Sequence, residues 1–218
     1  MEGNDVPGSS EGPDDDATLD TLVARTEGTQ IWRRLFHAMN GTVTAVLIVG
    51  LDLSRTVAVG LFGALFMALL GWDALRLTNP RANEWFFRMF NRLASPRESR
   101  KIASSTWYTL GIVVAVWLFP RPAAISGILV LAWADPAASY LGRRWGKRPF
   151  MGGTVEGTAV FIVVTLAVLT VRHSLAVAVP AALLIVLVER LSWPLDDNLA
   201  VPPVCAGIVT GLELLLRG

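Results

Sequence analysis

Apolar residues gather along the chain in seven long runs that are separated by short polar segments. The runs cover residues 35–53, 57–75, 104–120, 122–142, 155–171, 174–192 and 199–216. Each run approaches the ~20 residues that an α-helix needs to cross a hydrocarbon layer ~30 Å thick. The pattern therefore predicts an all-α, polytopic integral membrane protein with about seven transmembrane helices.

The polar segment between the second and third runs has a pattern of its own. Large apolar residues recur there at helical spacing among arginines: Trp85, Phe86, Met89, Phe90 and Leu93. A helix with one apolar and one basic face is typical of a segment that lies in the membrane interface. We expect an interfacial amphipathic helix here, and a helix that packs against soluble protein is the alternative.

The N-terminal segment has little to bury. It is rich in Gly, Pro, Ser and acidic residues, which predicts a disordered acidic tail over residues 1–28. It lacks the basic start and apolar core of a signal peptide, so we expect no cleaved signal peptide. Residues 29–218 are expected to form a single transmembrane domain, because the chain length is typical of one domain.

The composition agrees with a membrane protein. Hydrophobic residues make up 53% of the chain and charged residues 17%, and the mean hydropathy is +0.50, which is unusual for a soluble domain. The net charge of +1 indicates no partner by itself, and we expect no nucleic-acid partner. The single cysteine, Cys205, excludes an internal disulfide and is expected to be a buried thiol.

The positions of Lys and Arg test the seven runs, because basic residues concentrate in cytoplasmic connections. With seven spans, all but four of the 19 basic residues fall on one side of the membrane. The four exceptions are Arg55, Arg121, Arg172 and Arg217. This asymmetry predicts a cytoplasmic N-terminus, an outside C-terminus and a set of polar connections that share the cytoplasmic face.

Carboxylates inside or at the ends of the apolar runs are candidates for a functional site. A charge in such a position is costly unless it is paired or neutralised. These acids are Asp135, Glu156, Glu189, Asp196 and Asp197. The alternative is structural: such an acid pairs with a neighbouring arginine or caps a helix.

The connection between the fourth and fifth runs places one of these acids near basic residues. Asp135, Ser139, Gly142 and Arg143 recur at the spacing of one helical face. An acid that can hold a metal and cations that can hold phosphates would then lie along connected faces. Pro136 predicts a break or kink, which would expose backbone groups to a polar cavity.

A glycine-rich turn follows in the same connection. Gly152 and Gly153 allow the backbone to approach a ligand closely, and Thr154 can cap a helix that has Glu156 in its first turn. A glycine turn that leads into a helix N-terminus is a typical anion site. The segment therefore favours a bound phosphate or carboxylate.

Spacing excludes several familiar soluble sites. A Walker A loop has four residues between its glycines, whereas Gly142 and Gly146 are separated by three and Lys147 is followed by arginine. His37 and His173 lie in distant segments, so neither zinc chemistry nor a Ser/His/Asp triad is supported. What remains is carboxylate and amide oxygens suited to Mg²⁺ beside an Arg/Lys cluster, the usual parts for phosphoryl or nucleotidyl transfer.

Together, these segments resemble the CTP-dependent lipid alcohol kinases, which include polyprenol (dolichol) kinase, phytol kinase and yeast-type diacylglycerol kinase. "DPAASYLGRRWGKR…GGTVEGTAVF" and "ER…DDNLAVPP" are similar to the family's AD-x-x-A-x-x-x-G-R-x-x-G segment, its K-[ST]-x-E-G-[ST] turn and its late D-N before proline. "RRLFHAMNG" is similar to its R-[RK]-x-x-H-x-x-x-G. The matching positions are Ala134, Asp135, Ala138, Gly142, Arg143, Gly146, Thr154, Glu156, Gly157, Thr158, Asp197, Asn198 and Pro202, with Arg33, Arg34, His37 and Gly41 upstream.

The resemblance implies transfer of the γ-phosphoryl group of CTP to the hydroxyl of a membrane lipid alcohol, of the dolichol, polyprenol or phytol type or diacylglycerol. It implies that Asp135 and Asp197, assisted by Asn198 or Glu156, hold Mg²⁺ on the triphosphate. His37 is a candidate general base for the hydroxyl, and a hydrogen-bonding histidine at a helix end is the alternative. The residues expected to bind the nucleotide are Arg34, Gly142, Arg143, Arg144, Gly146, Lys147 and Thr154.

One position departs from the family pattern, because Gly153 stands where the family usually has a lysine. Either Lys147 or Arg148 supplies that charge from a different place, or the activity is altered or lost. Two other functions stay open. One is a phosphatidate cytidylyltransferase-type transferase, whose late P-G-H-G-G signature this chain lacks, and the other is a non-catalytic membrane homologue that only binds anionic lipid.

Overall fold

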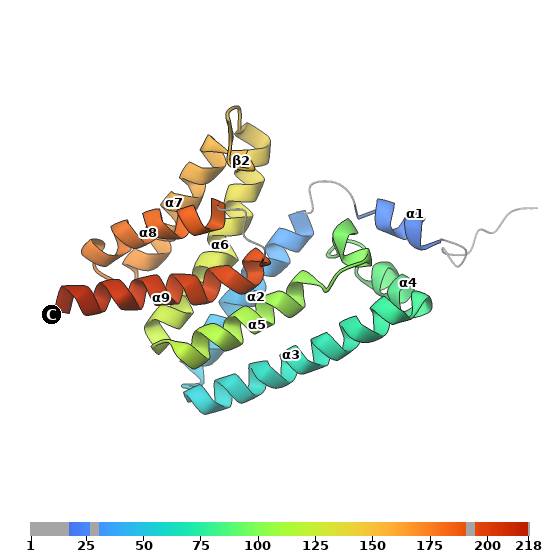
Figure 1. The fold of residues 1–218 in the computed structure, drawn as a ribbon, viewed down its shortest axis with the longest axis horizontal. Coiled ribbons are helices and arrows are strands. Elements are labelled where there is room, and N and C mark those ends of the chain that lie inside the picture. The colour runs from blue at the N-terminus through green and yellow to red at the C-terminus, as the bar shows by residue number, and fades with distance from the viewer. Residues whose placement is uncertain (1–17, 27–30, 191–194, 218) are drawn as a thin grey trace, which may run out of the picture.

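The computed structural model describes residues 18–26, 31–190 and 195–217. These residues are almost entirely helical, which confirms the predicted all-α class (Figure 1). The elements in chain order are α1 (Leu19–Ala24), α2 (Ile31–Gly50), α3 (Arg55–Thr78), α4 (Pro80–Met89), the 3₁₀ helix η1 (Pro96–Ser99), α5 (Ser104–Leu118), α6 (Arg121–Trp145), β1 (Pro149–Phe150), β2 (Gly153–Thr154), α7 (Val155–Thr170), α8 (Leu175–Arg190) and α9 (Asp197–Arg217).

Each of the seven predicted apolar runs coincides with a helix, namely α2, α3 and α5 to α9. Three of these helices, α3, α6 and α9, are long and apolar enough to cross a membrane, and α5 and α7 are apolar but shorter. Three helices of this length and composition indicate a membrane protein. The count of about seven spans stays a prediction.

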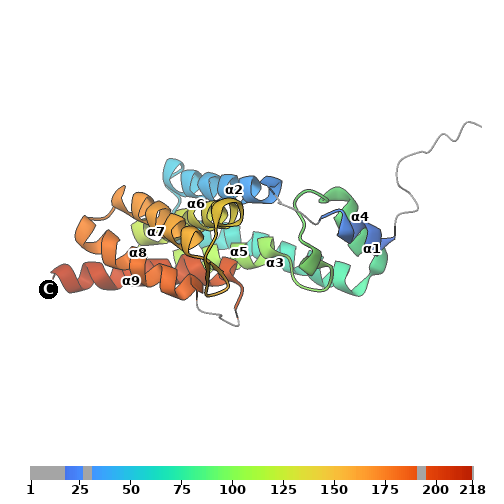
Figure 2. The ribbon, with the colours of Figure 1, turned by 90° about the horizontal axis from the view of Figure 1, so that it is seen from above.

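Helix α6 lies at the centre of the helical bundle. It contacts α2, α5, α7 and α9, and Val130, Leu131 and Ala132 in its middle are fully buried. Helix α8 packs against α7 and α9, while α3 packs against α5 at the edge of the molecule (Figures 1 and 2). Cys205 of α9 is part of this core, so the predicted buried thiol is confirmed.

Helix α9 begins close to its neighbours because two glycines face its first turns. A Cβ atom at Gly111 of α5 would lie 2.5 Å from the carbonyl oxygen of Asn198, and one at Gly127 of α6 would overlap the carbonyl of Pro202. Only glycine permits this approach of backbone to backbone. The contact brings the start of α9 beside α5 and α6, where the polar residues gather.

The polar connections meet at one end of the helices, which we call the polar end. It contains the beginnings of α2, α5, α7 and α9 and the ends of α3, α6 and α8. Ion pairs join segments across it, such as Arg33 with Glu98 at 3.1 Å and Arg97 with Asp196 at 3.1 Å. At the opposite end, Arg121 pairs with Asp52. This arrangement fits the predicted segregation of basic residues, and the membrane face on which each end lies stays a prediction.

The N-terminal segment differs in part from the expected tail. Residues 1–17 and 27–28 lie outside the described residues, but Leu19–Ala24 forms α1, whose Leu22 is only 3% exposed and packs against Phe86 and Phe87. Leu19, Leu22 and Val23 follow helical spacing and form one apolar face. The acidic and small residues around this short pattern concealed it, so the tail prediction is wrong for residues 19–24.

Helix α4 confirms the predicted amphipathic helix with shorter bounds. Asn79 caps it by accepting a hydrogen bond from the backbone N–H of Arg81 at 3.0 Å, and the helix ends at Met89. Its face toward the protein carries Phe86 and the fully buried Phe87, and Trp85 is exposed. The helix therefore packs on α1 and α3, and its position at the membrane interface stays a prediction.

A buried ion pair fixes the connection from α3 to α5. The Arg76 guanidinium, which is fully buried, binds the Asp73 carboxylate at 2.6 Å and donates to the carbonyl oxygens of Glu98 at 2.6 Å and Lys101 at 2.8 Å. Asp73 in turn accepts from the Thr106 hydroxyl at 2.6 Å. A buried ion pair is tolerated when its remaining polar atoms are hydrogen-bonded, as they are here.

We expect Arg76→Met to lower the free energy of unfolding by about 3–5 kcal/mol, because it leaves the Asp73 carboxylate buried without its partner. Thermal unfolding in detergent measures the loss. Arg81→Met, at an exposed position on the neighbouring helix, is the matched control and should change stability little. Equal melting temperatures of the two variants would contradict the role given to the buried pair.

Candidate functional site

One face of α6 carries the predicted site residues to the polar end. The helix continues through Pro136 to Trp145 without a break, so the predicted break is wrong, and a kink at Pro136 stays a prediction. Proline removes only one backbone N–H, and neighbouring helices support the turn because Pro136 is buried among them. As a result, Asp135, Ser139 and Arg143 stay in helical register and line the same space.

On one side of this face lies a cavity of about 320 Å³, which we call the hairpin cavity. Its walls come from the end of α6, the β1–β2 hairpin, the first turn of α7 and the end of α8. The residues that line it are Asp135, Ala138, Ser139, Gly142, Arg143, Gly152, Gly153, Thr154, Gly157, Glu189 and Arg190.

The hairpin owes its shape to the predicted glycine turn. Met151 and Gly152 both adopt positive φ angles, 41° and 74°, as a two-residue turn between antiparallel strands requires. Phe150 pairs with Gly153 across the turn. The Thr154 hydroxyl then accepts a hydrogen bond from the backbone N–H of Gly157 at 3.1 Å, so the predicted helix cap is confirmed.

Glycines let this hairpin lie directly against α6. A Cβ atom at Gly142 would lie 3.0 Å from the Thr154 hydroxyl, and one at Gly146 would lie 2.5 Å from it. A Cβ at Gly157 would likewise lie 3.1 Å from the carbonyl oxygen of Ala138. The geometry therefore gives Gly142 and Gly146 a packing role, and only Gly142 also lines the cavity.

On the other side of the α6 face lies a second cavity of about 170 Å³, which we call the central cavity. It lies between the first turns of α2, the 3₁₀ helix η1 and the start of α9. The residues that line it are Arg33, Arg34, His37, Arg97, Asp135, Pro136, Ser139, Arg143, Asp196, Asp197 and Asn198. Six predicted site residues from three distant segments thus meet here, and Asp135, Ser139 and Arg143 belong to both cavities.

Carboxylates and arginines surround Asp135 at this junction. The charges of Asp196, Asp197, Arg33 and Arg190 all act on it, yet among the described residues its own carboxylate has no hydrogen bond or ion pair. A carboxylate that is surrounded in this way and lacks a protein partner can bind a cation.

No group of three or more His, Cys, Asp or Glu that could hold a metal occurs within residues 18–26, 31–190 and 195–217. Mg²⁺, however, is commonly bound by one or two carboxylates together with the phosphates of a substrate. Asp135 and Asp197 supply two carboxylates that line the central cavity, and Asn198 adds an amide oxygen. The donor set fits this mode of Mg²⁺ binding.

Asp196 caps a helix and pairs with an arginine, which is the structural alternative to a role in a functional site. One of its oxygens accepts from the backbone N–H of Asn198 at 3.1 Å and from the amide of the same residue at 2.6 Å, which caps α9. The other oxygen pairs with Arg97 at 3.1 Å. Both oxygens are therefore occupied by the protein, which leaves Asp197 and Asp135 as the acids of the central cavity that are available to a ligand.

Four predicted site residues lie outside both cavities: Gly146, which packs against Thr154, and Arg144, Lys147 and Glu156. Arg144 contacts the hydroxyl of Tyr140 at 3.5 Å, Lys147 is exposed to solvent, and the Glu156 carboxylate accepts from the backbone N–H of Arg148 at 3.5 Å. Their predicted roles in binding phosphate or metal gain no support from this geometry.

Arg190 was missed by the sequence analysis. Its guanidinium lies against Gly153, so that a Cβ atom there would overlap Nη1 and lie 2.9 Å from Cζ. Its Nε is 2.9 Å from a Glu189 oxygen, an ion pair without hydrogen-bond geometry. The only sequence signal was the "ER" pair that ends the sixth apolar run. Arg190 thus brings a positive charge to the position where the family usually has a lysine.

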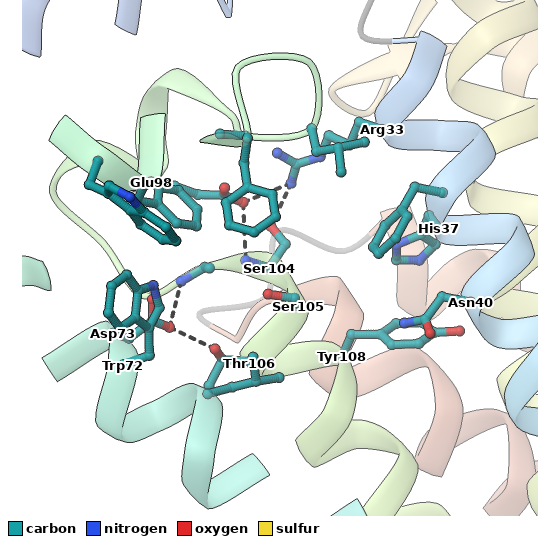
Figure 3. Close-up of a pocket in the computed structure, with 18 residues that line it drawn as sticks. Arg33, His37, Asn40, Trp72, Asp73, Glu98, Ser104, Ser105, Thr106 and Tyr108 are labelled. Carbon is teal, nitrogen blue, oxygen red and sulfur yellow. Dashed lines mark hydrogen bonds and ion pairs between the residues drawn. The ribbon is translucent and has the colours of Figure 1, made fainter. Parts of the chain in front are cut away.

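A third, larger cavity of about 500 Å³ adjoins the central cavity, and we call it the apolar cavity (Figure 3). Arg33 and His37 line both of these cavities. The His37 ring packs edge-on against Tyr108, with 4.5 Å between ring centroids. The His37 Nε2 and the Tyr108 hydroxyl are buried without a hydrogen-bond partner among the described residues. His37 therefore lies at the boundary of the two cavities, and its role as a general base stays a prediction.

A second polar cluster at the opposite end was not anticipated. The Ser126 hydroxyl lies 2.9 Å from Nε2 of His173, whose Nδ1 lies 2.7 Å from a Glu213 oxygen. The order of these groups is that of a hydrolytic triad, but Ser126 is fully buried inside α6. A nucleophile needs access to its substrate, so the cluster is best explained as a buried hydrogen-bond network that joins α6 to α9.

Comparison with known proteins gives relatives of a single kind. Over 122 residues, 54% of this chain, the sequence is 30% identical to CTP-dependent diacylglycerol kinase 1 of Schizosaccharomyces pombe, of which the match covers 54%. It is 30% identical over 117 residues to the protein of that name from Eremothecium gossypii and 25% identical over 118 residues to the one from Saccharomyces cerevisiae, covering 37% and 40% of those proteins.

The chain thus spans about half or less of the length of the curated relatives that it matches. No protein-family model and no solved structure matches it. The similarity to three CTP-dependent lipid kinases confirms the resemblance that the sequence motifs predicted.

We expect Thr154→Ala to weaken the first turn of α7 by about 0.5–2 kcal/mol, because the capping hydrogen bond to Gly157 is lost. Hydrogen exchange of the backbone amides at the start of α7 measures this effect. Thr154→Ser keeps the hydroxyl and should retain the protection. If both variants exchange at the same rate, the hydroxyl does not hold the hairpin and helix together.

Proposed function

We propose that this chain is a CTP-dependent lipid kinase, which transfers the γ-phosphoryl group of CTP to the hydroxyl of a membrane lipid alcohol. The observation that carries the proposal is the α6 face of Asp135, Ser139 and Arg143, which borders two polar cavities at once. Diacylglycerol is the first candidate acceptor, because the relatives are named for it. Dolichol, polyprenols and phytol-type alcohols are the other candidates.

The hairpin cavity would hold the phosphates. It combines the guanidinium groups of Arg143 and Arg190 with the backbone at the beginning of α7. A helix N-terminus and fixed cations attract a triphosphate and stabilise the charge that spreads over the transferring group. Arg34 donates to the Ser139 hydroxyl at 3.3 Å, and Arg143 donates to it at 3.2 Å. Ser139 thereby orients two cations at the boundary of the cavities.

Mg²⁺ would be held by Asp135 and Asp197, with Asn198 as an additional oxygen donor. Its chemistry, when bound, is to neutralise phosphate oxygens and align them for transfer. The carboxylates themselves orient the ion toward the α6 face, because Asp135 is part of that face and Asp197 begins α9 beside it. Asp196 keeps the start of α9 in place through its cap and its pair with Arg97.

The acceptor hydroxyl would approach from the side of α2. His37 lies at the boundary between the central and apolar cavities, and its Nε2 is available to take the hydroxyl proton. The lipid oxygen then forms a bond to the γ-phosphorus, the bond from that phosphorus to the β-phosphate oxygen breaks, and CDP leaves. The polar end is proposed to face the cytoplasm, with about seven spans, so that CTP and lipid meet there.

The proposal is tested by incubating the purified chain with Mg²⁺, γ-labelled CTP or ATP, and diacylglycerol, phytol or polyprenol. We expect label in a lipid phosphate with CTP, and we expect Asp135→Asn and Asp197→Asn each to lower the rate by roughly 100-fold or more. Asp52→Asn, at the opposite end and 89% exposed in its side chain, should retain full activity.

Two results would overturn this function. A CDP-lipid formed from α-labelled CTP and phosphatidate would indicate a cytidylyltransferase instead. Label transfer that is unchanged in both carboxylate variants would show that the reaction takes place elsewhere.

Arg190 provides a separate test of the departure at Gly153. We expect Arg190→Ala to raise the KM for CTP by roughly 10-fold or more, since one desolvated cation is lost from the phosphates. Gly153→Lys alone should also bind CTP less tightly, because the introduced side chain would overlap the Arg190 guanidinium. The double variant Gly153→Lys with Arg190→Ala should recover CTP binding, because the lysine then occupies the vacated space.

The controls for this test are Lys147→Ala and Arg148→Ala, which alter exposed cations outside both cavities. Both should bind CTP like the unmodified protein. If either one loses more CTP affinity than Arg190→Ala does, that residue supplies the charge in place of Arg190.

A further inference from the structure

The apolar cavity lies between α2, α3, α4 and α5. His37 lies in its wall (Figure 3) and also borders the central cavity. Its wall is built largely from apolar side chains, among them Phe36, Leu69, Trp72 and Phe86. A volume of about 500 Å³ lies within the ~300–1,000 Å³ that is usual for ligand pockets. The cavity is therefore large enough for a segment of a lipid but not for two complete acyl chains.

The acidic groups that line this cavity are already bound by the protein. Asp73 is paired with Arg76 and accepts from Thr106. Glu98 accepts from the backbone N–H of Ser104 at 3.1 Å and pairs with Arg33. Because both carboxylates already have protein partners, neither needs a bound cation, and the cavity is suited to a neutral molecule.

Two polar groups in the wall lack partners. The Tyr108 hydroxyl and His37 Nε2 are both buried and have no hydrogen bond among the described residues, and the two rings touch. Tyr108 itself is only 2% exposed. A buried polar group without a partner is unfavourable, and a hydroxyl-bearing ligand would supply the missing partner.

From this combination, we propose that the apolar cavity binds the acceptor lipid, with the glycerol end of one diacylglycerol against the wall that His37 and Tyr108 form and the adjoining acyl segment against Phe36, Leu69 and Trp72. This assignment rests on the proposed kinase function. The hydroxyl then lies on the side where Arg33 and His37 also border the central cavity. The remainder of the acyl chains extends past the exposed rim residues Trp85 and Phe90 into the bilayer.

The charges in the cavity wall also favour binding of a lipid alcohol over binding of an anionic phospholipid. An anionic headgroup would have to lie beside the Asp73 and Glu98 carboxylates, whereas a glycerol hydroxyl needs only the neutral partners Tyr108 and His37. Arg33, the cation at the boundary, binds Glu98 and the Ser104 hydroxyl through one nitrogen, and its Nη1 has no hydrogen-bond partner among the described residues. We therefore expect diacylglycerol to occupy the cavity in preference to phosphatidate.

The test uses the full chain in phosphatidylcholine nanodiscs and two probes. The first is dioctanoylglycerol as the acceptor in the kinase assay, and the second is a diacylglycerol that carries a diazirine in one acyl chain. Leu69→Trp fills the cavity from α3, and Ser105→Phe fills it from α5. Leu65→Trp is the matched control, because Leu65 lies one turn earlier on α3, is exposed and does not line the cavity.

We expect both filling variants to raise the KM for dioctanoylglycerol by roughly tenfold, because the lipid loses packing space. The KM for CTP should not change, and Leu65→Trp should behave like the unmodified protein in both respects. Photocrosslinks should fall on the segments of α2, α3, α4 and α5 that line the cavity, and Leu69→Trp should remove them. The use of two filling variants from different helices guards against a folding defect in one of them.

Failure of this inference is distinguishable from failure of the kinase function. If the unmodified protein phosphorylates dioctanoylglycerol while Leu69→Trp and Leu65→Trp share one KM for it, the cavity assignment is wrong and the function stands. Crosslinks on the outer face of α3, or stronger labelling of the cavity by a diazirine phosphatidate, would also overturn the assignment. Labelling of the cavity by diacylglycerol without any phosphate transfer would support the assignment and overturn the function.

Discussion

The cost of placing charge among apolar helices determines where most charged side chains of the described residues lie. Charged and hydrogen-bonding side chains collect where helices end, and most of them collect at one end. Where a charged side chain is buried, its hydrogen-bond partners are buried beside it. Arg76 and Asp73 are buried, yet each of their polar atoms is bound by a side chain or carbonyl from a neighbouring segment.

In contrast, Asp135 and several polar groups near it have polar atoms without hydrogen-bond partners in the part of the chain that the structure describes. Its carboxylate, the Nε2 of His37, one guanidinium nitrogen of Arg33 and the Tyr108 hydroxyl lack hydrogen-bond partners within the described ranges. They lie along the connected walls of the central and apolar cavities. Buried polar groups are usually hydrogen-bonded, so such a cluster fits a place where a ligand supplies the missing partners. The Arg76 network serves as the fixed frame beside it, since both involve Glu98 and the start of α5.

The sequence was sufficient for the helices and for the local turn chemistry. Apolar periodicity predicted α2, α3 and α5 to α9, and the Gly152 and Thr154 positions predicted a turn and a capped helix, because these features depend on neighbouring residues alone. The meeting of Arg190 with Gly153 could not be predicted in this way, because it depends on how α8 packs beside the hairpin. For the same reason, spacing along one helix predicted roles for Arg144 and Lys147, which lie outside the cavities. The short helix α1 was missed because a single buried leucine provides too little pattern.

Sharing of the α6 face is the feature on which the proposed chemistry depends. Asp135, Ser139 and Arg143 link a cavity rich in backbone and guanidinium groups to one that holds carboxylates and His37, and the apolar cavity continues from there. The most direct test is an experimentally determined structure of the full chain with Mg²⁺ and a CTP analogue that has a non-hydrolysable β,γ bridge. We expect the phosphates between Arg143 and Arg190, with the γ-phosphate on the side of Asp135 and His37. A nucleotide bound away from this α6 face, with Asp135 and Arg143 in contact only with the protein, would contradict this expectation.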